Sequence, residues 1–201
     1  MAATPLLEAE ALGAERAGRQ LFEGLDLRLD AGDIVHLRGA NGAGKTTLLR
    51  ILAGLSAYGF DGRINSRAPI LFLGHHTAVK GTLSCRENLL WHPSGERFTE
   101  DLIDVALQRV GLLGYEYVPA SQLSAGQQRR VNLARLYLSK RPLWLLDEPF
   151  AAIDTAGVQS LQARFAEHAE QGGAVLLTSH QALDALSQAR FVDLDGGPGL
   201  E

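Results

Sequence analysis

The feature that most constrains this chain is a glycine-rich loop, Gly39-Ala-Asn-Gly-Ala-Gly44-Lys45-Thr46-Thr47. A short apolar run precedes it at residues 34–38, and residues 46–55 follow it with leucines at helical spacing. In a strand–loop–helix unit of this kind, backbone N–H groups wrap around a phosphate chain at the helix N-terminus. The alternative is a glycine turn that binds nothing, and the flanking strand and helix patterns argue against it. The sequence therefore predicts a nucleoside triphosphate site.

The residue types in the loop suit this role. Glycines permit a left-handed backbone and close approach of the chain to phosphate. Lys45 supplies a positive charge for the β- and γ-phosphates, and the Thr46 hydroxyl is a candidate ligand of Mg²⁺. We predict that the nucleotide contacts the following residues: Gly39, Ala40, Asn41, Gly42, Ala43, Gly44, Lys45, Thr46 and Thr47.

Apolar periodicity indicates an α/β chain. Strands are predicted at 21–29 and 34–38, joined by a tight turn, and at 69–74, and a helix at 99–110 buries one face that includes Leu102 and Ile103. The middle third is mainly helical. The final third alternates: helix 125–139, strand 143–146, helix 155–171, strand 174–178, helix 182–188 and strand 191–194. This alternation is typical of a parallel sheet with crossover helices.

Composition limits the function classes. A chain of 201 residues suits one domain, and a net charge of −4 gives no general attraction to nucleic acid. The single cysteine, Cys85, excludes an intrachain disulfide and favours a cytoplasmic protein. No apolar run approaches the roughly 18 residues that span a bilayer, and acidic Glu8 and Glu10 do not suit a signal peptide. We therefore expect any membrane role to be peripheral.

Two adjacent carboxylates follow an apolar strand in Leu143-Trp-Leu-Leu-Asp147-Glu148. Successive strand residues point in opposite directions, so we expect Asp147 to face Mg²⁺ and Glu148 to face the attacking water, as general base or water-positioning group. The alternative is an acidic strand end that faces solvent.

A second anion site is possible at Leu123-Ser124-Ala-Gly126-Gln127, where a predicted helix begins. The N–H groups at a helix N-terminus and the helix dipole attract negative charge. Alone, this segment is best interpreted as a helix cap. Its position between the phosphate loop and the acidic pair makes it more specific.

Together these motifs resemble those of the ATP-binding cassette (ABC) ATPases over essentially the whole chain. The phosphate loop resembles their Walker A loop, Leu123–Gln127 the signature motif, Leu143–Asp147 the Walker B strand and Glu148 the catalytic glutamate. Residues 152–154 resemble the D-loop, and His180 resembles the switch histidine that contacts the γ-phosphate. A lone histidine at a strand end is usually structural, but the order of the motifs argues for this role.

The resemblance implies a P-loop NTPase fold of the ABC type. It would have a RecA-like mixed sheet core with an N-terminal antiparallel β part, formed by about 1–76 and 138–201, and an inserted helical subdomain at about 77–137. It also implies ATP and Mg²⁺ as cofactors and a homodimer in the ATP-bound state. Each site would then combine the phosphate loop of one copy with Ser124, Gly126 and Gln127 of the other.

Two positions depart from the family pattern. The aromatic residue that usually stacks on adenine is absent, and Arg16 lies near its place; either its guanidinium stacks on the base or it is solvated. His75 occupies the place of the usual glutamine that reaches Mg²⁺, so it is a candidate metal ligand. We expect the side chains of His75 and His76 to point apart on an extended backbone, which disfavours a joint metal site.

The flanking residues narrow the resemblance to ATPases of the haem exporters that serve cytochrome c maturation. They are Gly74-His75-His76, Pro149-Phe150 and Gln181 beside the motifs above. This implies a peripheral subunit at the cytoplasmic face of the bacterial inner membrane. It would bind integral membrane subunits, with residues 79–91 as a candidate docking segment unless most of them pack inside, and no nucleic acid. The alternatives are another ABC importer or exporter, or a soluble ABC ATPase that acts on nucleic acid or ribosomes.

Overall fold

The computed structural model describes residues 4–56, 59–91, 96–181, 186 and 188–194. The chain divides into two compact units. The first, here the sheet unit, comprises residues 1–72, 141–149 and 162–201; the second, the helical unit, comprises 73–140 and 150–161. Each unit is described by itself.

A three-stranded antiparallel sheet in the sheet unit has the order β2–β1–β4. Its strands are β1 (Leu7–Arg16), β2 (Arg19–Leu29) and β4 (Phe60–Ser66). A two-residue turn with left-handed backbone at Ala17 and Gly18 joins β1 to β2, as is usual in tight hairpins. Opposite the register shift in β1, a Cβ on Gly62 would lie 2.6 Å from the Ala11 carbonyl oxygen, so only glycine fits there. The apolar pattern predicted β2 but neither β1 nor β4, the other two strands of this sheet.

A second sheet has five strands in the order β5–β6–β7–β3–β8. Its strands are β3 (Ile34–Arg38), β5 (Ile70–Leu73), β6 (Leu143–Leu146), β7 (Ala174–Thr178) and β8 (Arg190–Asp193). The pairs β6–β7, β7–β3 and β3–β8 are parallel. Every residue of β6 and β7 is buried, which explains why their sequences are continuous apolar runs rather than alternating ones.

The two strands predicted on either side of residues 30–33 are present and are joined by a tight turn, as expected, but the turn connects strands of different sheets. Both strands exist, but β2 lies in the antiparallel sheet whereas β3 pairs with β7 and β8. The physical reason is burial on both faces of β3. Ile34, Val35 and Leu37 are at most 1% exposed, which a central strand of a parallel sheet provides and an edge hairpin does not.

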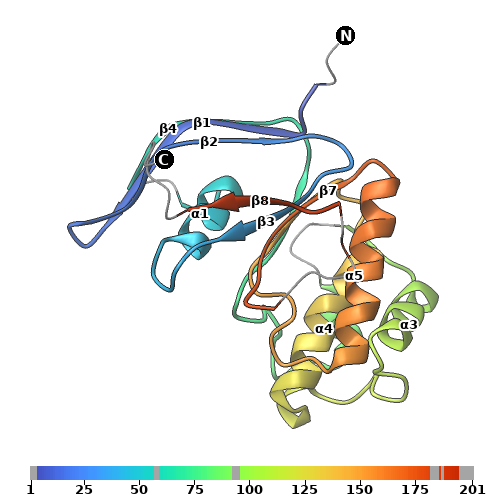
Figure 1. Cartoon of the computed structure of the whole chain (residues 1–201). Helices are drawn as coiled ribbons and strands as arrows, with labels where there is room; N and C mark the ends of the chain where they lie inside the picture. The colour runs from blue at the N-terminus through green and yellow to red at the C-terminus, as the bar shows by residue number, and fades with distance from the viewer. Residues whose placement is uncertain (1–3, 57–58, 92–95, 182–185, 187, 195–201) are drawn as a thin grey trace. The chain divides into compact units, whose positions relative to one another are not determined.

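Helix α1 (Lys45–Leu52) joins the two sheets of the sheet unit (Figure 1). Its buried residues Leu48, Leu49, Ile51 and Leu52 belong to one core cluster with apolar residues of both sheets. Gly54 follows just beyond its C-terminal end, as the sequence predicts. This packing holds the phosphate loop, which connects β3 to α1, at the edge of the larger sheet.

The helical unit has its own core. It contains α2 (Cys85–Leu90), α3 (Glu100–Arg109), a 3₁₀ turn (Ala120–Gln122) and α4 (Ala125–Leu138). Cys85 is buried in this core, and desolvation raises the pKa of its thiol to about 11, so it is an inert apolar residue rather than a nucleophile. Helix α5 (Thr155–Glu170) begins in the helical unit and continues, from residue 162, in the sheet unit.

The predicted buried face of α3 is wrong at Leu102, which is 54% exposed. The helix packs through Ile103, Ala106 and Leu107, which are at most 1% exposed. Leu102 stands one residue before Ile103 and is therefore about 100° further round the helix. The predicted helix at 182–188 lies for the most part outside the described residues. In the described part of the chain, no helix has the length and apolar character that crossing a membrane requires.

Candidate nucleotide site

The phosphate loop leads from β3 into the first turn of α1. Lys45 Nζ donates hydrogen bonds to the carbonyl oxygens of Gly39, at 2.5 Å, and Ala40, at 3.0 Å. Gly44 caps the helix with a left-handed backbone (φ 103°), and a Cβ there would lie 3.0 Å from Leu21 Cβ. No side chain caps the N-terminus of α1 and its first turn has no acidic residue. The positive end of this helix dipole is therefore suited to an anion.

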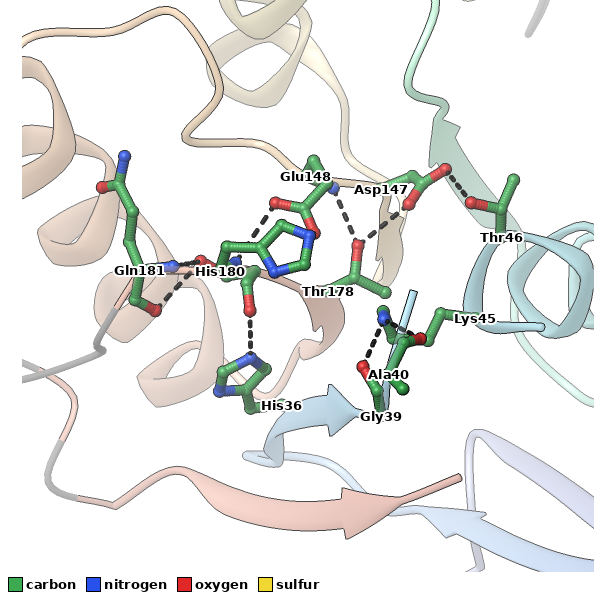
Figure 2. A network of polar contacts seen from close by, with 11 residues as sticks. His36, Gly39, Ala40, Lys45, Thr46, Asp147, Glu148, Thr178, His180 and Gln181 are labelled. Atoms are coloured by element: carbon green, nitrogen blue, oxygen red, sulfur yellow. Dashed lines mark hydrogen bonds and ion pairs between the residues drawn. The ribbon is translucent and has the colours of Figure 1, made fainter. Parts of the chain in front are cut away.

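Asp147 connects the loop to the carboxyl end of β6. Its side chain is almost fully buried, and its Oδ2 accepts a hydrogen bond of 2.8 Å from the Thr46 hydroxyl (Figure 2). Its Oδ1 accepts one of 2.9 Å from the Thr178 hydroxyl at the end of β7. A carboxylate and a threonine hydroxyl are the hard oxygen ligands that Mg²⁺ prefers. The predicted metal ligands Thr46 and Asp147 thus lie side by side.

Glu148 does not continue β6, which ends at Leu146. Its backbone is left-handed (φ 51°), and its N–H donates a hydrogen bond of 2.9 Å to the Thr178 hydroxyl. A left-handed backbone costs a non-glycine residue about 1–2 kcal/mol. The turn, rather than the predicted alternation along a strand, separates the carboxylates of Asp147 and Glu148. Thr178 bridges these two residues, and nothing in its sequence context indicated that role.

His180 lies beside the Glu148 carboxylate. The backbone N–H of His180 donates a hydrogen bond of 3.3 Å to Glu148 Oε2, and its ring Nε2 lies 3.5 Å from Glu148 Oε1 (Figure 2). The His180 side chain is 65% exposed, so it is open to a ligand on its free side. The sheet unit therefore brings together most of the predicted machinery: Lys45, Thr46, Asp147, Glu148 and His180.

The signature residues belong to the helical unit. Ser124 is the N-cap of α4: its hydroxyl accepts a hydrogen bond of 3.2 Å from the Gln127 N–H, and Gln127 Oε1 accepts one of 2.9 Å from the Ser124 N–H. This reciprocal capping box confirms the interpretation as a helix cap. Gly126 lies close to the D-loop, since a Cβ there would be 3.1 Å from the Ala152 carbonyl oxygen.

The D-loop residue Asp154 is paired with α4. Its Oδ2 lies 2.8 Å from Arg130 Nη2, and its Oδ1 accepts a hydrogen bond of 2.8 Å from the Gly157 N–H. The Gly157 hydrogen bond and the Arg130 charge lower the pKa of Asp154, which is thus ionised near neutral pH. These contacts fix the loop to the same helix that Ser124 caps.

The expectation that His75 and His76 point apart is wrong. Their ring centroids lie 5.5 Å apart, edge to face, because the chain bends at these residues instead of remaining extended. The buried Arg129 guanidinium donates to the carbonyl oxygens of Gly74 and His75, at 3.0 and 3.2 Å, and holds the bend. Among the described residues no group of three or more His, Cys, Asp or Glu side chains is placed to hold a metal ion. His75 belongs to the helical unit, and its role at Mg²⁺ stays a prediction.

Two predictions remain: the adenine contact at Arg16 and the docking segment at residues 79–91. Arg16 ends β1 opposite Arg19 in the hairpin and is exposed. In the candidate docking segment, Val79 and Leu89 pack in the helical core, as the alternative interpretation holds, whereas Leu90 and Trp91 are 37% and 77% exposed. The exposed apolar residues of this segment are therefore confined to the end of α2.

Comparisons with known proteins show the family of this chain and its fold. A family model described as "ABC transporter" matches residues 22–151, so the chain belongs to the ABC transporter family. A solved structure described as the ATP binding subunit of an ABC transporter superposes with a TM-score of 0.82 at 24% identity, covering 94% of this chain and 85% of that one. The predicted fold class, an α/β P-loop NTPase of the ABC type, is confirmed.

Two relatives are similar over nearly their whole length. The chain is 48% identical to the cytochrome c biogenesis ATP-binding export protein CcmA of Pseudomonas syringae, over 97% of each chain. It is 49% identical to the protein of the same name from Vibrio cholerae, over 90% of this chain and 93% of the relative.

Proposed function

We propose that this chain is the ATP-binding and ATP-hydrolysing subunit of a membrane transporter complex that exports haem for the biogenesis of c-type cytochromes. The observation that carries the ATPase assignment is the continuous network from Thr46 through Asp147, Thr178 and Glu148 to His180. The names of the relatives support the cytochrome c assignment.

The residues present fit ATP with Mg²⁺. The uncapped N-terminus of α1 and the Lys45 ammonium suit the β- and γ-phosphates, and Thr46 with Asp147 offers two oxygen ligands for the metal. A bound Mg²⁺ would offset negative charge on the phosphates. In this proposal Glu148 orients the attacking water and accepts its proton, while the exposed ring of His180 holds the γ-phosphate.

We further propose that the chain acts as a homodimer when ATP is bound. Ser124, Gly126 and Gln127 at the start of α4 form a second anion-binding helix end that would complete the site of another copy. Mixing two inactive variants tests this. If the site is shared, combining Lys45→Ala chains with Ser124→Arg chains forms mixed dimers with one intact site each, and ATP turnover returns. No recovery in mixtures that demonstrably form mixed dimers would contradict shared sites.

The partners proposed are integral membrane subunits, which place the chain at the cytoplasmic face of the bacterial inner membrane. The exposed Leu90 and Trp91 at the end of α2 support a docking surface in the helical subdomain, residues 77–137, with 1–76 and 138–201 as the core. Nucleic acid is not among the proposed partners. Co-purification with membrane proteins would support the assignment, and recovery with ribosomes or DNA alone would refute it.

We also propose one contact with adenine, at Arg16, and one near Mg²⁺, at His75. Stacking of Arg16 on adenine is supported by its exposure at the β1–β2 turn. An unchanged ATP affinity in the Arg16→Ala variant would refute this stacking. The exposed position of His75 supports a role near Mg²⁺, and an unchanged Mg²⁺ dependence of turnover in His75→Ala would remove that role.

The experiment that tests the proposed function is deletion of the gene followed by a haem stain for c-type cytochromes. We expect the stained bands to disappear and to return with the wild-type gene. Normal cytochrome c levels in the deletion strain would overturn the haem assignment and leave the ATPase assignment standing.

A further inference from the structure

The peptide bond between Ser179 and His180 is held at both ends. Its carbonyl oxygen lies 3.0 Å from the Nε2 of His36, and its N–H donates to Glu148 Oε2 across 3.3 Å (Figure 2). In a trans peptide the C=O and N–H groups point in opposite directions, so these partners hold the peptide from opposite sides. One contact reaches β3 and the other reaches the proposed catalytic glutamate.

His36 occupies a position that otherwise suits an apolar residue. It stands between Val35 and Leu37 in the buried strand β3, is only 6% exposed and packs beside the ring of Phe191. Its Nδ1 is buried without a hydrogen-bond partner in the described part of the chain. A half-satisfied polar ring is costlier to bury than an apolar side chain. What the imidazole supplies here, and an apolar residue would not, is the contact with Ser179.

The contact between His36 and Ser179 determines which ring nitrogen of His36 carries a proton. A carbonyl oxygen only accepts hydrogen bonds, so Nε2 must carry the proton and donate it to the Ser179 oxygen. The neutral ring then has a bare Nδ1, which agrees with the absence of an acceptor around that atom among the described residues. In this tautomer His36 is a single donor, through Nε2, to the Ser179 oxygen.

We propose that His36 is a positioning residue for ATP hydrolysis, which fixes the 179–180 peptide so that its N–H stays on the Glu148 carboxylate. The side chain of His180 is largely exposed, so its own packing does little to hold it beside Glu148. Without the donor on His36, the peptide can rotate and carry its N–H away from Glu148. The inference rests on the proposed ATPase function and assigns to that site a residue that acts through the 179–180 peptide.

Three substitutions separate positioning from packing. The amide nitrogen of glutamine reaches about as far as Nε2 of histidine, that of asparagine only as far as Nδ1, and leucine has no donor. In the full-length chain we expect His36→Leu and His36→Asn to lower kcat roughly 3- to 10-fold, the scale of one hydrogen bond, with the KM for ATP unchanged. His36→Gln should recover most of the loss. Equal loss in the Gln and Leu variants, or no loss in the Leu variant, would overturn the proposal.

A spectroscopic measurement on the wild-type chain decides the case if a variant does not fold. In ¹⁵N spectra of the isotope-labelled wild-type protein at neutral pH, the His36 ring signals, identified by sequence-specific assignment, should show the neutral Nε2–H tautomer. An Nδ1–H tautomer would overturn the proposal, because Nε2 could not donate to Ser179. This readout does not depend on ATP turnover. A wild-type chain without ATPase activity would thus count against the proposed function, and the tautomer would still decide the hydrogen bond.

Discussion

Thr46 and Asp147 stand 101 positions apart in the sequence, and the Thr46 hydroxyl donates to the Asp147 carboxylate across 2.8 Å. The contact joins the first turn of α1 to the carboxyl end of β6. Ligands in α/β folds bind at the carboxyl ends of the strands, where the loops bring distant residues together. The proposed ATPase chemistry therefore lies at the carboxyl ends of strands in the five-stranded sheet.

The turnover prediction concerns Glu148. Replacing it with glutamine keeps the shape of the side chain but removes the base, so Glu148→Gln should still bind ATP and lose roughly 10²–10⁴-fold in turnover, the scale of general base catalysis. Steady-state ATP hydrolysis and nucleotide affinity measure both effects. The matched control is Glu170→Gln at the exposed end of α5, which should keep wild-type turnover. Near-normal hydrolysis by the Glu148 variant would refute the assignment.

Two serines of the helical unit allow a cap to be distinguished from a ligand contact. Ser84 and Ser124 begin α2 and α4 with the same capping box. Each substitution to alanine should lower the free energy of unfolding by about 1 kcal/mol in urea titrations. Only Ser124→Ala should also lower ATP turnover, and Ser124→Arg should abolish it while ATP still binds. Equal turnover in the two alanine variants would show that Ser124 is only a helix cap and does not contact the nucleotide.

The phosphate loop should not tolerate a side chain at Gly44. Alanine there meets both a left-handed backbone and close contact with Leu21 and Phe22, so Gly44→Ala should lose ATP binding and be destabilised by about 1–3 kcal/mol. Gly172→Ala is the control, because Gly172 also has a positive φ but open space around its Cβ position. It should be destabilised by about 1–2 kcal/mol and keep its ATP affinity, measured by titration calorimetry. Normal ATP affinity in Gly44→Ala would contradict the site.

The stability of the sheet unit should depend on pH through His168. This side chain is buried on α5, stacks on Trp144 at 3.6 Å and contacts the Pro142 carbonyl oxygen through Nε2. Desolvation lowers its pKa from 6.5 to about 4. The folded state thus favours the neutral ring. The resulting stability is complete above about pH 6.5, and it falls as the pH drops toward 4, because the unfolded chain takes up the proton first.

Urea titrations between pH 4 and 8 test this dependence. His168→Gln keeps a donor for Pro142 but does not titrate, so its free energy of unfolding should fall less than that of the wild type between pH 6.5 and 4. The exposed His76 provides the control, and His76→Gln should follow the wild-type curve. Parallel curves for wild type and His168→Gln would show that His168 does not cause the acid sensitivity.

The elements that the sequence predicts best are those whose burial is uniform. Residues 143–146 and 174–177 are continuous apolar runs, and both strands, 143–146 and 174–178, have the predicted bounds. Strand β4 is mostly polar, and β1 is interrupted by a register shift, so pairing within their sheet rather than local pattern defines them. The same limit explains why the sequence did not indicate the partners of β3.

In the candidate site, too, the sequence predicted some residues and not others. Motif spacing indicated Lys45, Thr46, Asp147 and Glu148, because phosphate and metal chemistry restricts the residue types there. The left-handed turn at Glu148, the Thr178 bridge and the His36 contact arise from strands that meet only in the folded chain. Periodicity carries no signal for such contacts. The roles assigned from the motifs stay predictions until the variants are measured.

The most direct test of the central claim, that ATP hydrolysis at Glu148 drives c-type cytochrome biogenesis, is complementation of the deletion strain. Genes for the wild-type chain, Glu148→Gln and Glu170→Gln would be expressed at equal levels and the cells stained for haem bound to c-type cytochromes. We predict that the wild-type and Glu170→Gln chains restore the stain and that Glu148→Gln does not. Full restoration by Glu148→Gln would contradict the account.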